Sequence, residues 1–294
     1  MTSNSRTGRC RICGKRGRYI QGDLCDACMA TRSIIQALLD VITEKIENST
    51  ELNTEEPEFR WLAGLAALFS DYRPLAHIYR FYTLALEYIR HPGQSVSAWK
   101  IAERIRTLRD IDAWIRYYQQ LGIIEYDGNI IKIPEGSILE KARVAIEAHG
   151  PDLRQRASFC VVGYVLLKIA EAIFTGNTHE LPNGGRKLRR FIASIPFFLT
   201  RFIEGEPIRR SALRRFLSPR GVSIMDVIEK IEASFARSDT RKQVDWFEER
   251  RWQGIDEAIY RPAPYVIALF ERVRERMRER ERERERGYDA RGVT

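Results

Sequence analysis

The sequence predicts a mainly α-helical protein that begins with a small metal-binding segment and contains a short β-hairpin. Apolar residues recur at helical spacing over most of the 294 residues. Four of the five cysteines lie between Cys10 and Cys28, and two alternating apolar runs flank Gly128. Apolar residues make up 44 % of the chain and charged residues 30 %, and this balance excludes a mainly disordered protein.

The expected helices follow the apolar period between helix-breaking residues. Prolines start or end several of them, as at Pro57, Pro151 and Pro262. A chain of this length corresponds to about two or three domains. The expected helices are 29–48, 57–70, 73–91, 97–108, 110–122, 137–149, 152–175, 186–203, 207–217, 222–236, 239–258 and 263–286.

The four N-terminal cysteines, Cys10, Cys13, Cys25 and Cys28, form the pattern C-x2-C-x11-C-x2-C. In a chain without a visible secretory signal, this spacing indicates a tetrahedral zinc site and not a disulfide framework. Four thiolates close the coordination shell, so one structural Zn²⁺ is expected. Its binding would supply folding energy to residues 1–33, which have little core of their own.

The order of elements around these cysteines is that of a treble-clef zinc finger: a strand at residues 18–20, a turn at 21–23, and a helix that carries the second cysteine pair. The stretch from Cys10 to Cys28 resembles the finger of a small-subunit ribosomal protein and the treble-clef fingers of transcription and translation factors. In those families the basic hairpin touches the nucleic-acid backbone. The resemblance therefore implies such contacts for Arg11, Lys15, Arg16 and Arg18.

The segment 95–136 has a different pattern. Two expected helices precede alternating apolar runs about a turn at 127–129, and these runs predict a β-hairpin. Helix, turn, helix and a two-stranded wing resemble a winged helix-turn-helix domain, in which the second helix enters the major groove. The segment has equal numbers of basic and acidic side chains, and many winged helices bind proteins. Both a nucleic-acid partner and a protein partner therefore stay open for this segment. The resemblance implies contacts through Arg109, Arg116, Tyr117 and Gln120, with Lys132 on the wing.

The positive charge is concentrated in two regions of a chain whose net charge is +9. Residues 1–33 carry seven basic and two acidic side chains, net +5, and residues 186–220 carry ten and two, net +8. Such patches suit a phosphate backbone, although solvated helix faces on a basic protein would have the same composition. The residues of the second patch are Arg186, Lys187, Arg189, Arg190, Arg209, Arg210, Arg214, Arg215 and Arg220.

The rest of the chain is expected to be helical. Residues 34–94 would form a helical linker or scaffold, and 137–261 a helical domain that carries the basic patch. Within that domain, 209–217 and 225–235 have the form of another helix-turn-helix, without an evident wing after it. Residues 262–294 are expected to form an exposed charged helix with a frayed tail, because Glu and Arg alternate from Glu271 to Arg286.

The sequence contains no phosphate-binding glycine loop, no metal-hydrolase histidine pair and no nucleophile elbow. Cys160 lies in an apolar run typical of a core helix. Neither residues 1–11 nor the apolar runs 159–174 and 191–203 have the composition and length of a signal peptide or membrane span. These features predict a cytoplasmic protein that is not an enzyme.

The predicted fold class is mainly α, with an N-terminal treble-clef zinc finger, a winged helix-turn-helix with a small β-hairpin, and a C-terminal helical domain. The first functional hypothesis is a zinc-containing DNA-binding transcriptional regulator of the archaeal type. One alternative is a ribosome- or RNA-associated factor, and another is a non-enzymatic helical adaptor of a larger assembly. DNA is favoured over RNA, no membrane partner is expected, and a protein partner or homodimer stays open.

Overall fold

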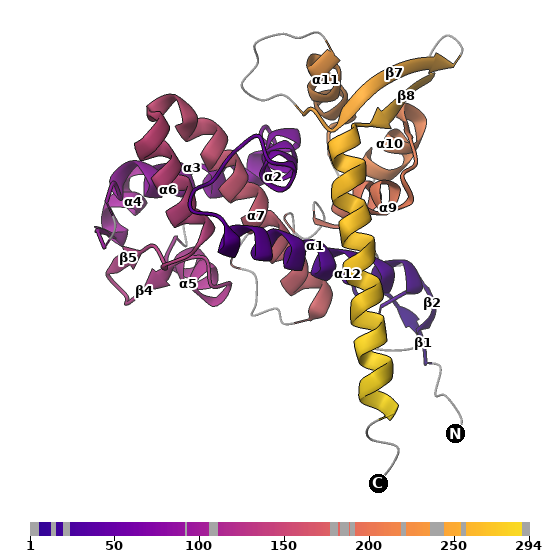
Figure 1. Ribbon diagram of the computed structural model, residues 1–294, viewed down its shortest axis with the longest axis horizontal. Helices are drawn as coiled ribbons and strands as arrows, with labels where there is room; N and C mark the ends of the chain where they lie inside the picture. Colours follow the sequence, from indigo (N-terminus) through magenta and orange to yellow (C-terminus); the bar gives the residue numbers. More distant parts are fainter. Residues whose placement is uncertain are drawn as a thin grey trace.

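The computed structural model describes residues 6–12, 16–19, 24–91, 93–105, 111–176, 182, 188, 192–218, 222–235, 244–253 and 257–289. The chain is mainly helical, with short antiparallel sheets and a cysteine cluster near the N-terminus (Figure 1). This confirms the predicted mainly α class and the early cysteine-rich segment.

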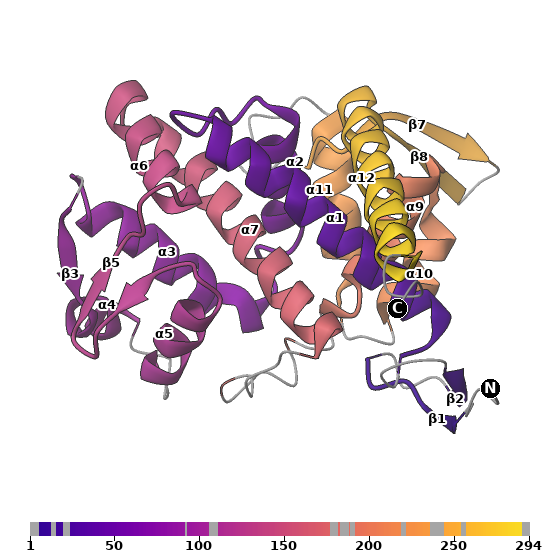
Figure 2. The same cartoon turned by 60° about the horizontal axis from the view of Figure 1, so that its bottom comes forward.

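Two crossing helices, α2 (Pro57–Leu68) and α7 (Arg154–Thr175), form the centre of the molecule. They approach so closely that a Cβ on Gly163 would lie 2.1 Å from the carbonyl oxygen of Leu62. The long helix α1 (Asp26–Asn48) packs against α7 from the other side (Figure 2). By length and composition the helix over Pro151–Thr175 could span a membrane, and 83 % of its most apolar window is buried inside the protein.

The first unit, residues 76–132, lies at one end of the molecule (Figure 2). Its three strands form an antiparallel sheet in the order β3-β5-β4, with Val96 paired to Ile131. The predicted hairpin is therefore present, and β3 adds a strand that the sequence did not predict. The elements are α3 (Ala76–Tyr88), which follows η1 (Arg73–Leu75), then β3 (Ser95–Ser97), α4 (Ala98–Arg104), α5 (Ile111–Gln120), β4 (Glu125–Tyr126) and β5 (Ile130–Lys132).

The connection from the first unit returns to the centre through α6 (Ile138–His149) and η2 (Pro151–Leu153). Ser137 caps α6 by accepting a hydrogen bond from the backbone N–H of Glu140, and Gly150 ends the helix with φ of 93°. The chain thus reaches α7 through a sharp turn, and α6 packs on α7.

The second unit, residues 195–262, lies at the opposite end and has the same order of elements. Its sheet order is β6-β8-β7, with Ile208 paired to Tyr260. The elements are α9 (Ile195–Glu204), β6 (Ile208–Arg209), α10 (Arg210–Leu217), α11 (Ile224–Phe235), β7 (Phe247–Gln253) and β8 (Glu257–Pro262).

The predicted helix over 239–258 is wrong, because the described part of this segment forms the strands β7 and β8. Along β8, Ala258, Tyr260 and Pro262 are buried and alternate with more exposed residues, which is the period of a half-buried strand. β7 is an edge strand whose charged residues face solvent, so its sequence lacks a clear apolar alternation. The second helix-turn-helix pattern is therefore followed by a hairpin after all.

The two units also share the spacing of their buried residues. Ten buried apolar positions on α3, β3–α4 and α5 have buried apolar counterparts at the same spacing on α9, β6–α10 and α11. The two units therefore repeat one arrangement around the α2–α7 crossing. The matched sets are Ile78, Phe81, Tyr82 and Ala85 with Ile195, Phe198, Leu199 and Phe202; Val96, Ile101 and Ile105 with Ile208, Leu213 and Leu217; Trp114, Ile115 and Tyr118 with Val227, Ile228 and Ile231.

The second unit is fixed to α2 by buried contacts. Trp246 stacks on Trp61 with ring centroids 5.4 Å apart and donates its indole N–H to the Trp61 carbonyl at 3.2 Å. Lys230, which is 9 % exposed, reaches from α11 to Asp71 at 2.9 Å. The two units and the central helices therefore share one continuous hydrophobic core.

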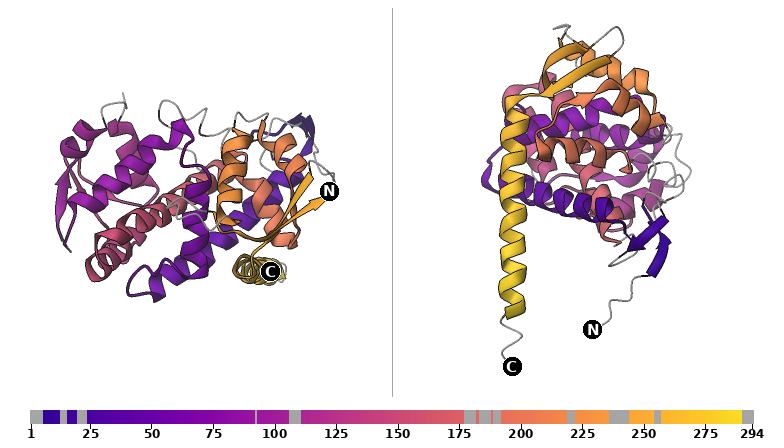
Figure 3. Two further views of the ribbon diagram at one scale, coloured as in Figure 1. Left: turned by 90° about the horizontal axis from the view of Figure 1, so that it is seen from above. Right: turned by 90° about the vertical axis from the view of Figure 1, so that its right-hand side faces the viewer.

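The last helix, α12 (Pro264–Asp289), runs from this core into solvent (Figure 3). Its first half is buried through Val266, Leu269 and Phe270, whereas residues 281–286 are exposed. Arginines in between hold it to the rest of the fold: Arg276 pairs with Glu44, and Arg280 pairs with Asp40 at 2.7 Å. The predicted charged helix is confirmed, and part of its charge is used for packing.

Candidate metal centre and basic surfaces

Three cysteines from two separate elements meet near the N-terminus. Cys10 follows β1 (Arg6–Arg9) in the turn that leads to β2 (Arg16–Tyr19). Cys25 is the N-cap of α1, and Cys28 lies in the first turn of that helix. Their Sγ atoms all lie within 4.8 Å of one another, and Cys10 and Cys28 are buried.

This cluster could hold a metal ion. Thiolates bound to one tetrahedral Zn²⁺ at ~2.3 Å would lie roughly 3.8 Å apart, and the three Sγ atoms, all within 4.8 Å of one another, are near enough to share one ion. The N-terminus of α1 favours negative charge on Cys25 and Cys28 through the helix dipole. The fourth predicted ligand, Cys13, lies outside the described residues.

Arg11, in the turn after Cys10, connects the cysteine cluster to the centre of the fold. Its guanidinium donates a hydrogen bond to the carbonyl of Phe174 at 3.1 Å, at the C-terminal end of α7. Gly176 ends that helix with φ of 83°, and a Cβ there would lie 2.4 Å from Arg11 Nη1. The left-handed backbone therefore favours glycine at this position, and the guanidinium of Arg11 would have to shift to admit a Cβ there.

The other predicted contacts of the finger are less fully described. Arg16 is exposed on β2, and Arg18 lies in the same strand opposite Thr7. Lys15 lies outside the described residues. Arg11 and Arg16 are thus both exposed, and Arg11 in addition donates a hydrogen bond to the end of α7.

On the first unit, the predicted contacts lie on a surface with little net charge. Arg116 and Gln120 are exposed on α5, and Lys132 is exposed on β5. Tyr117 is 3 % exposed and packs against Trp114, which does not fit the predicted contact to a groove. Arg109 lies outside the described residues. The exposed face of α5 also carries Asp112, which balances Arg116.

The hairpin of the first unit is held by local hydrogen bonds. Tyr126 donates its hydroxyl hydrogen to the Gly128 carbonyl at 2.6 Å, and the carboxylate of Asp127 accepts from the backbone N–H groups of Asn129 and Ile130. These backbone hydrogen bonds stabilise the charged carboxylate and lower the pKa of Asp127. This hairpin is compact and its exposed residues do not form a basic patch.

The second unit presents a basic surface. Between Pro207 and Ser218 there are four arginines and no acidic residue. Arg209, Arg214 and Arg215 are exposed and Arg210 is partly buried. Within the described part of the chain, none of these four guanidinium groups forms an ion pair with a carboxylate. The other predicted members of this patch, Arg186, Lys187, Arg189, Arg190 and Arg220, lie outside the described residues.

Beside α10, the β7–β8 hairpin carries residues that sequence reasoning missed. Arg250 forms an ion pair with Glu232 of α11, and its guanidinium lies 5.3 Å from the ring centroid of Trp252. Trp252 is 51 % exposed. The Tyr260 hydroxyl donates to Glu232 at 2.8 Å, and burial together with that carboxylate raises the pKa of Tyr260. The glycine at position 254 was the available sequence signal for a hairpin.

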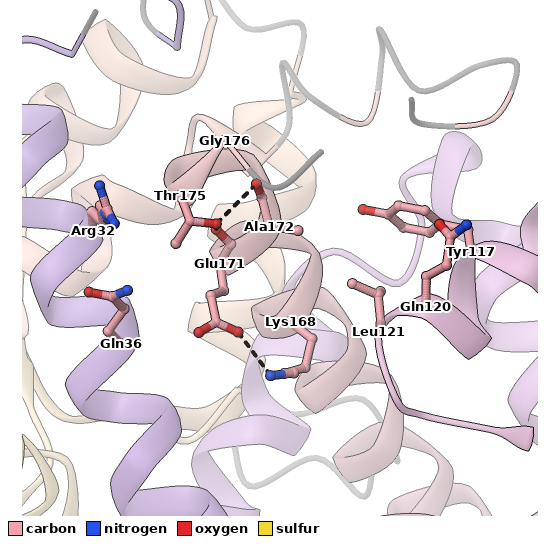
Figure 4. Close-up of a pocket in the computed structure, with 10 residues that line it drawn as sticks. All are labelled: Arg32, Gln36, Tyr117, Gln120, Leu121, Lys168, Glu171, Ala172, Thr175 and Gly176. Atoms are coloured by element: carbon pink, nitrogen blue, oxygen red, sulfur yellow. Dashed lines mark hydrogen bonds and ion pairs between the residues drawn. The ribbon is translucent and has the colours of Figure 1, made fainter. Parts of the chain in front are cut away.

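The structure also contains a polar pocket of about 670 Å³ between α1, α5 and α7 (Figure 4). Figure 4 shows Arg32 and Gln36 on one side and Gln120 on the other, with an ion pair between Lys168 and Glu171 at 2.9 Å. The Lys168 cation is thus already neutralised by a neighbour. The pocket does not assemble a nucleophile beside a general base among its described lining residues.

Cys160 is fully buried in α7 and donates its thiol hydrogen to the Phe59 carbonyl at 3.3 Å. Burial raises the pKa of the Cys160 thiol to about 12. At neutral pH it is therefore a protonated core residue and not a nucleophilic thiolate.

No protein-family model matches the chain, and no curated protein or solved structure shows significant similarity to it.

Proposed function

We propose that the protein is a zinc-containing, DNA-binding regulator in which two winged-helix units flank a helical core, and in which the second unit supplies the main contact to the DNA backbone. The strands β1 and β2 of the N-terminal segment and the helix α10 lie toward the same end of the molecule (Figure 2). The basic residues at that end would bind the DNA backbone without reading its sequence, and the first unit would not contact the DNA.

The metal part of the proposal is a structural zinc ion held by Cys10, Cys25, Cys28 and the predicted ligand Cys13. A hairpin that supplies one ligand pair and a helix N-terminus that supplies the other have the order of a treble-clef finger. An all-thiolate set suits a structural ion, because a catalytic zinc keeps one coordination position open. Measurement of metal content should find about one Zn²⁺ per chain, and a Cys25→Ser variant should lose it.

The winged-helix part rests on topology. In both units a helix, a strand, two helices and a hairpin follow in order, and the first strand pairs with the last one. This is the arrangement that the sequence of the first unit resembles. The hairpin of the second unit, which is the longer of the two, then corresponds to a wing beside α10 and α11.

The observation that carries the proposed DNA contact is the unbalanced charge of α10. Other arginines of this chain pair with carboxylates of the fold: Arg276 and Arg280 of α12 pair with α1, and Arg272 pairs with Glu58 of α2. Arg214 and Arg215 have no described carboxylate partner and lie in solvent. A row of phosphates would supply the missing anions, with counterion release as the driving force.

The helix that would face a major groove in the second unit is less suited to base reading. The exposed residues of α11 include Met225, Asp226 and Glu229, which combine an apolar side chain with two carboxylates. Carboxylates would face phosphates unfavourably. The charge distribution therefore favours backbone binding through α10 and the wing over sequence reading through α11.

The direct test is binding of the zinc-loaded protein to duplex DNA across a salt series from 50 to 200 mM. The Arg214→Gln/Arg215→Gln variant should bind about 10-fold more weakly, and the slope of log affinity against log salt should fall by about 2. The matched control is Arg282→Gln/Arg286→Gln, which removes the same charge from the exposed end of α12. The control should bind like the unchanged protein.

Each other outcome of this test has a defined meaning. Equal losses in both double variants would show that net charge, and not α10, governs binding. Stronger binding to structured RNA than to duplex DNA would replace the regulator with an RNA-associated factor. A lack of binding to either nucleic acid would leave a helical adaptor whose α10 arginines meet an acidic protein.

A further inference from the structure

We infer that Trp252, on the β7–β8 hairpin, stacks on an unpaired base, so that the preferred ligand of the second unit is nucleic acid in which a single strand borders a duplex. This inference rests on the proposed function, because it assumes that the second unit binds nucleic acid. The arginines of α10 suggest a phosphate backbone as the ligand, whereas Trp252 adds an unpaired base as a second part of that ligand.

The first support is the exposure of the Trp252 indole. Trp61, Trp114 and Trp246 are each at most 2 % exposed, as expected for large apolar side chains. Trp252 is 51 % exposed, although it lies on a regular strand next to a buried face of the sheet. The hairpin that carries it reaches outward from the body of the molecule (Figure 1).

The second support is that the Trp252 ring is already held in place. The guanidinium of Arg250 lies 5.3 Å from its ring centroid and 5.9 Å from that of Phe235, so it contacts both aromatic rings. Arg250 is itself fixed by its ion pair with Glu232, whose other oxygen accepts a hydrogen bond from Tyr260. An aromatic side chain that is ordered before binding loses little conformational entropy when it stacks on a ligand.

The third support is the charge that surrounds the hairpin. Arg251 pairs in register with Ile259, and Ile259 pairs with Arg209 of β6, so these two arginines share one face of the sheet. Arg251 is also paired with Glu249, and Arg209 continues into the arginines of α10. Trp252 pairs with Ala258 and therefore lies on the opposite face of the sheet from Arg209 and Arg251, so the hairpin carries an exposed aromatic ring on one face and arginines on the other. Arginines combined with an exposed aromatic ring bind single strands, where each base offers a flat face.

An intact duplex would be a poorer ligand for this ring. The bases of a duplex are stacked on one another, and insertion of a side chain between them costs a few kcal/mol of unstacking. An unpaired base beside the end of a duplex offers its face without that cost. The arginines of α10 could then hold the duplex backbone while Trp252 contacts the first unpaired base.

The first unit provides an internal control. Its hairpin carries Tyr126, whose hydroxyl is tied to the Gly128 carbonyl and which is only partly exposed. Its exposed indole is Trp99, 70 % exposed, on α4 and not on a strand of the hairpin. A general effect of removing an exposed tryptophan should therefore appear equally in Trp99→Ala and Trp252→Ala variants.

The experiment compares three DNA probes of one sequence: a blunt duplex, a duplex with a single-stranded overhang, and the single strand alone. The Trp252→Ala variant should lose about 10-fold in affinity for the overhang probe and for the single strand, with little change for the blunt duplex. Trp252→Phe should keep most of the affinity, because it retains an aromatic face, and Trp99→Ala should bind like the unchanged protein.

A spectroscopic readout supplements affinity. In a Trp99→Phe background, Trp252 is the remaining exposed tryptophan. Its fluorescence should fall on addition of the overhang probe and should become protected from acrylamide, whereas the blunt duplex should leave both properties nearly unchanged.

The results also separate this inference from the proposed function. If the unchanged protein binds with a steep salt dependence but Trp252→Ala binds every probe equally well, the stacking role is overturned and the α10 contact stands. An equal loss on all three probes would likewise overturn it, because stacking on an unpaired base cannot explain weaker binding to a blunt duplex. If the unchanged protein binds none of the probes, both proposals fall.

Discussion

The first and second units have the same order of elements and the same buried spacing, but their surfaces differ in charge and shape. Over 95–105 the first unit has Lys100, Glu103 and Arg104, whereas 207–218 of the second unit has four arginines and no acid. The hairpins differ as well: β4 and β5 have 2 and 3 residues, and β7 and β8 have 7 and 6. The buried positions alone thus maintain the arrangement, and the exposed positions are free to acquire different partners.

The comparison also shows where the two units depend on each other. Both pack against the crossing of α2 and α7, and the second unit extends its buried contacts to α2 through Trp246 and Lys230. The units should therefore unfold together although their surfaces act separately.

The largest effect is expected for Gly163→Ala, which would place a Cβ 2.1 Å from the Leu62 carbonyl oxygen. The backbone of α2 would have to move, so the free energy of unfolding should fall by about 3 kcal/mol. Thermal unfolding followed by circular dichroism should show one transition at lower temperature. Ser158→Ala, in the same helix, adds no volume and serves as the control; equal midpoints for both variants would contradict the close crossing.

The next effect is expected at the attachment of α12 to α2. Arg272 on α12 pairs at 2.5 Å with Glu58, whose side chain is only 3 % exposed. Arg272→Ala would leave a buried carboxylate without its cation and should cost roughly 2–4 kcal/mol of unfolding free energy. Arg282→Ala on the exposed end of the same helix should cost almost nothing. Chemical denaturation measures the free energy of unfolding of both variants. Equally small losses of free energy in the two variants would mean that the Glu58 carboxylate does not depend on Arg272.

A smaller effect is expected where the finger meets α7. Arg11→Ala would remove the hydrogen bond to the Phe174 carbonyl and should lower the free energy of unfolding by about 1 kcal/mol. Arg16→Ala, which changes an exposed residue of the same finger, is the matched control. If Arg11→Ala weakens DNA binding without lowering stability, Arg11 is a phosphate contact as the sequence resemblance implied.

The smallest effect is confined to the hairpin of the first unit. The pKa of Asp127 is lowered by backbone hydrogen bonds in the folded state, so its contribution to stability is full above the ordinary carboxyl pKa. That contribution is lost as the pH falls through the lower, folded pKa. The melting temperature of Asp127→Asn should therefore vary less with pH than that of the unchanged protein below about pH 4. Parallel curves would contradict the role of these hydrogen bonds.

Much of the local structure could be predicted from the sequence, because apolar period and turn residues determine it. The helix boundaries near Pro57 and Gly150, the cysteine cluster and the hairpin about Gly128 all follow from nearby residues. The charged edge strand β7 could not be predicted in this way, because Glu248 to Arg251 face solvent and resemble the charged helix α12 in composition.

The repeat itself was hidden because it preserves spacing and not residue identity. Tyr82 corresponds to Leu199, and Trp114 to Val227, so the two cores are filled by side chains of different shape. The role of Arg11 at the end of α7 depends on a contact across 163 residues of chain, which no local pattern encodes. The cysteine pattern and the run of arginines over 209–215 can be seen in the sequence, whereas the exposure of Trp252 and the internal repeat depend on the fold.

The most direct test of the central claim, that the second unit and not the first contacts nucleic acid, is amide hydrogen exchange of the whole protein with and without DNA. The account predicts slower exchange on binding in 207–218 and 247–253, with exchange in 95–132 unchanged. Protection centred on α5 and the β4–β5 hairpin instead would contradict it and would assign recognition to the first unit.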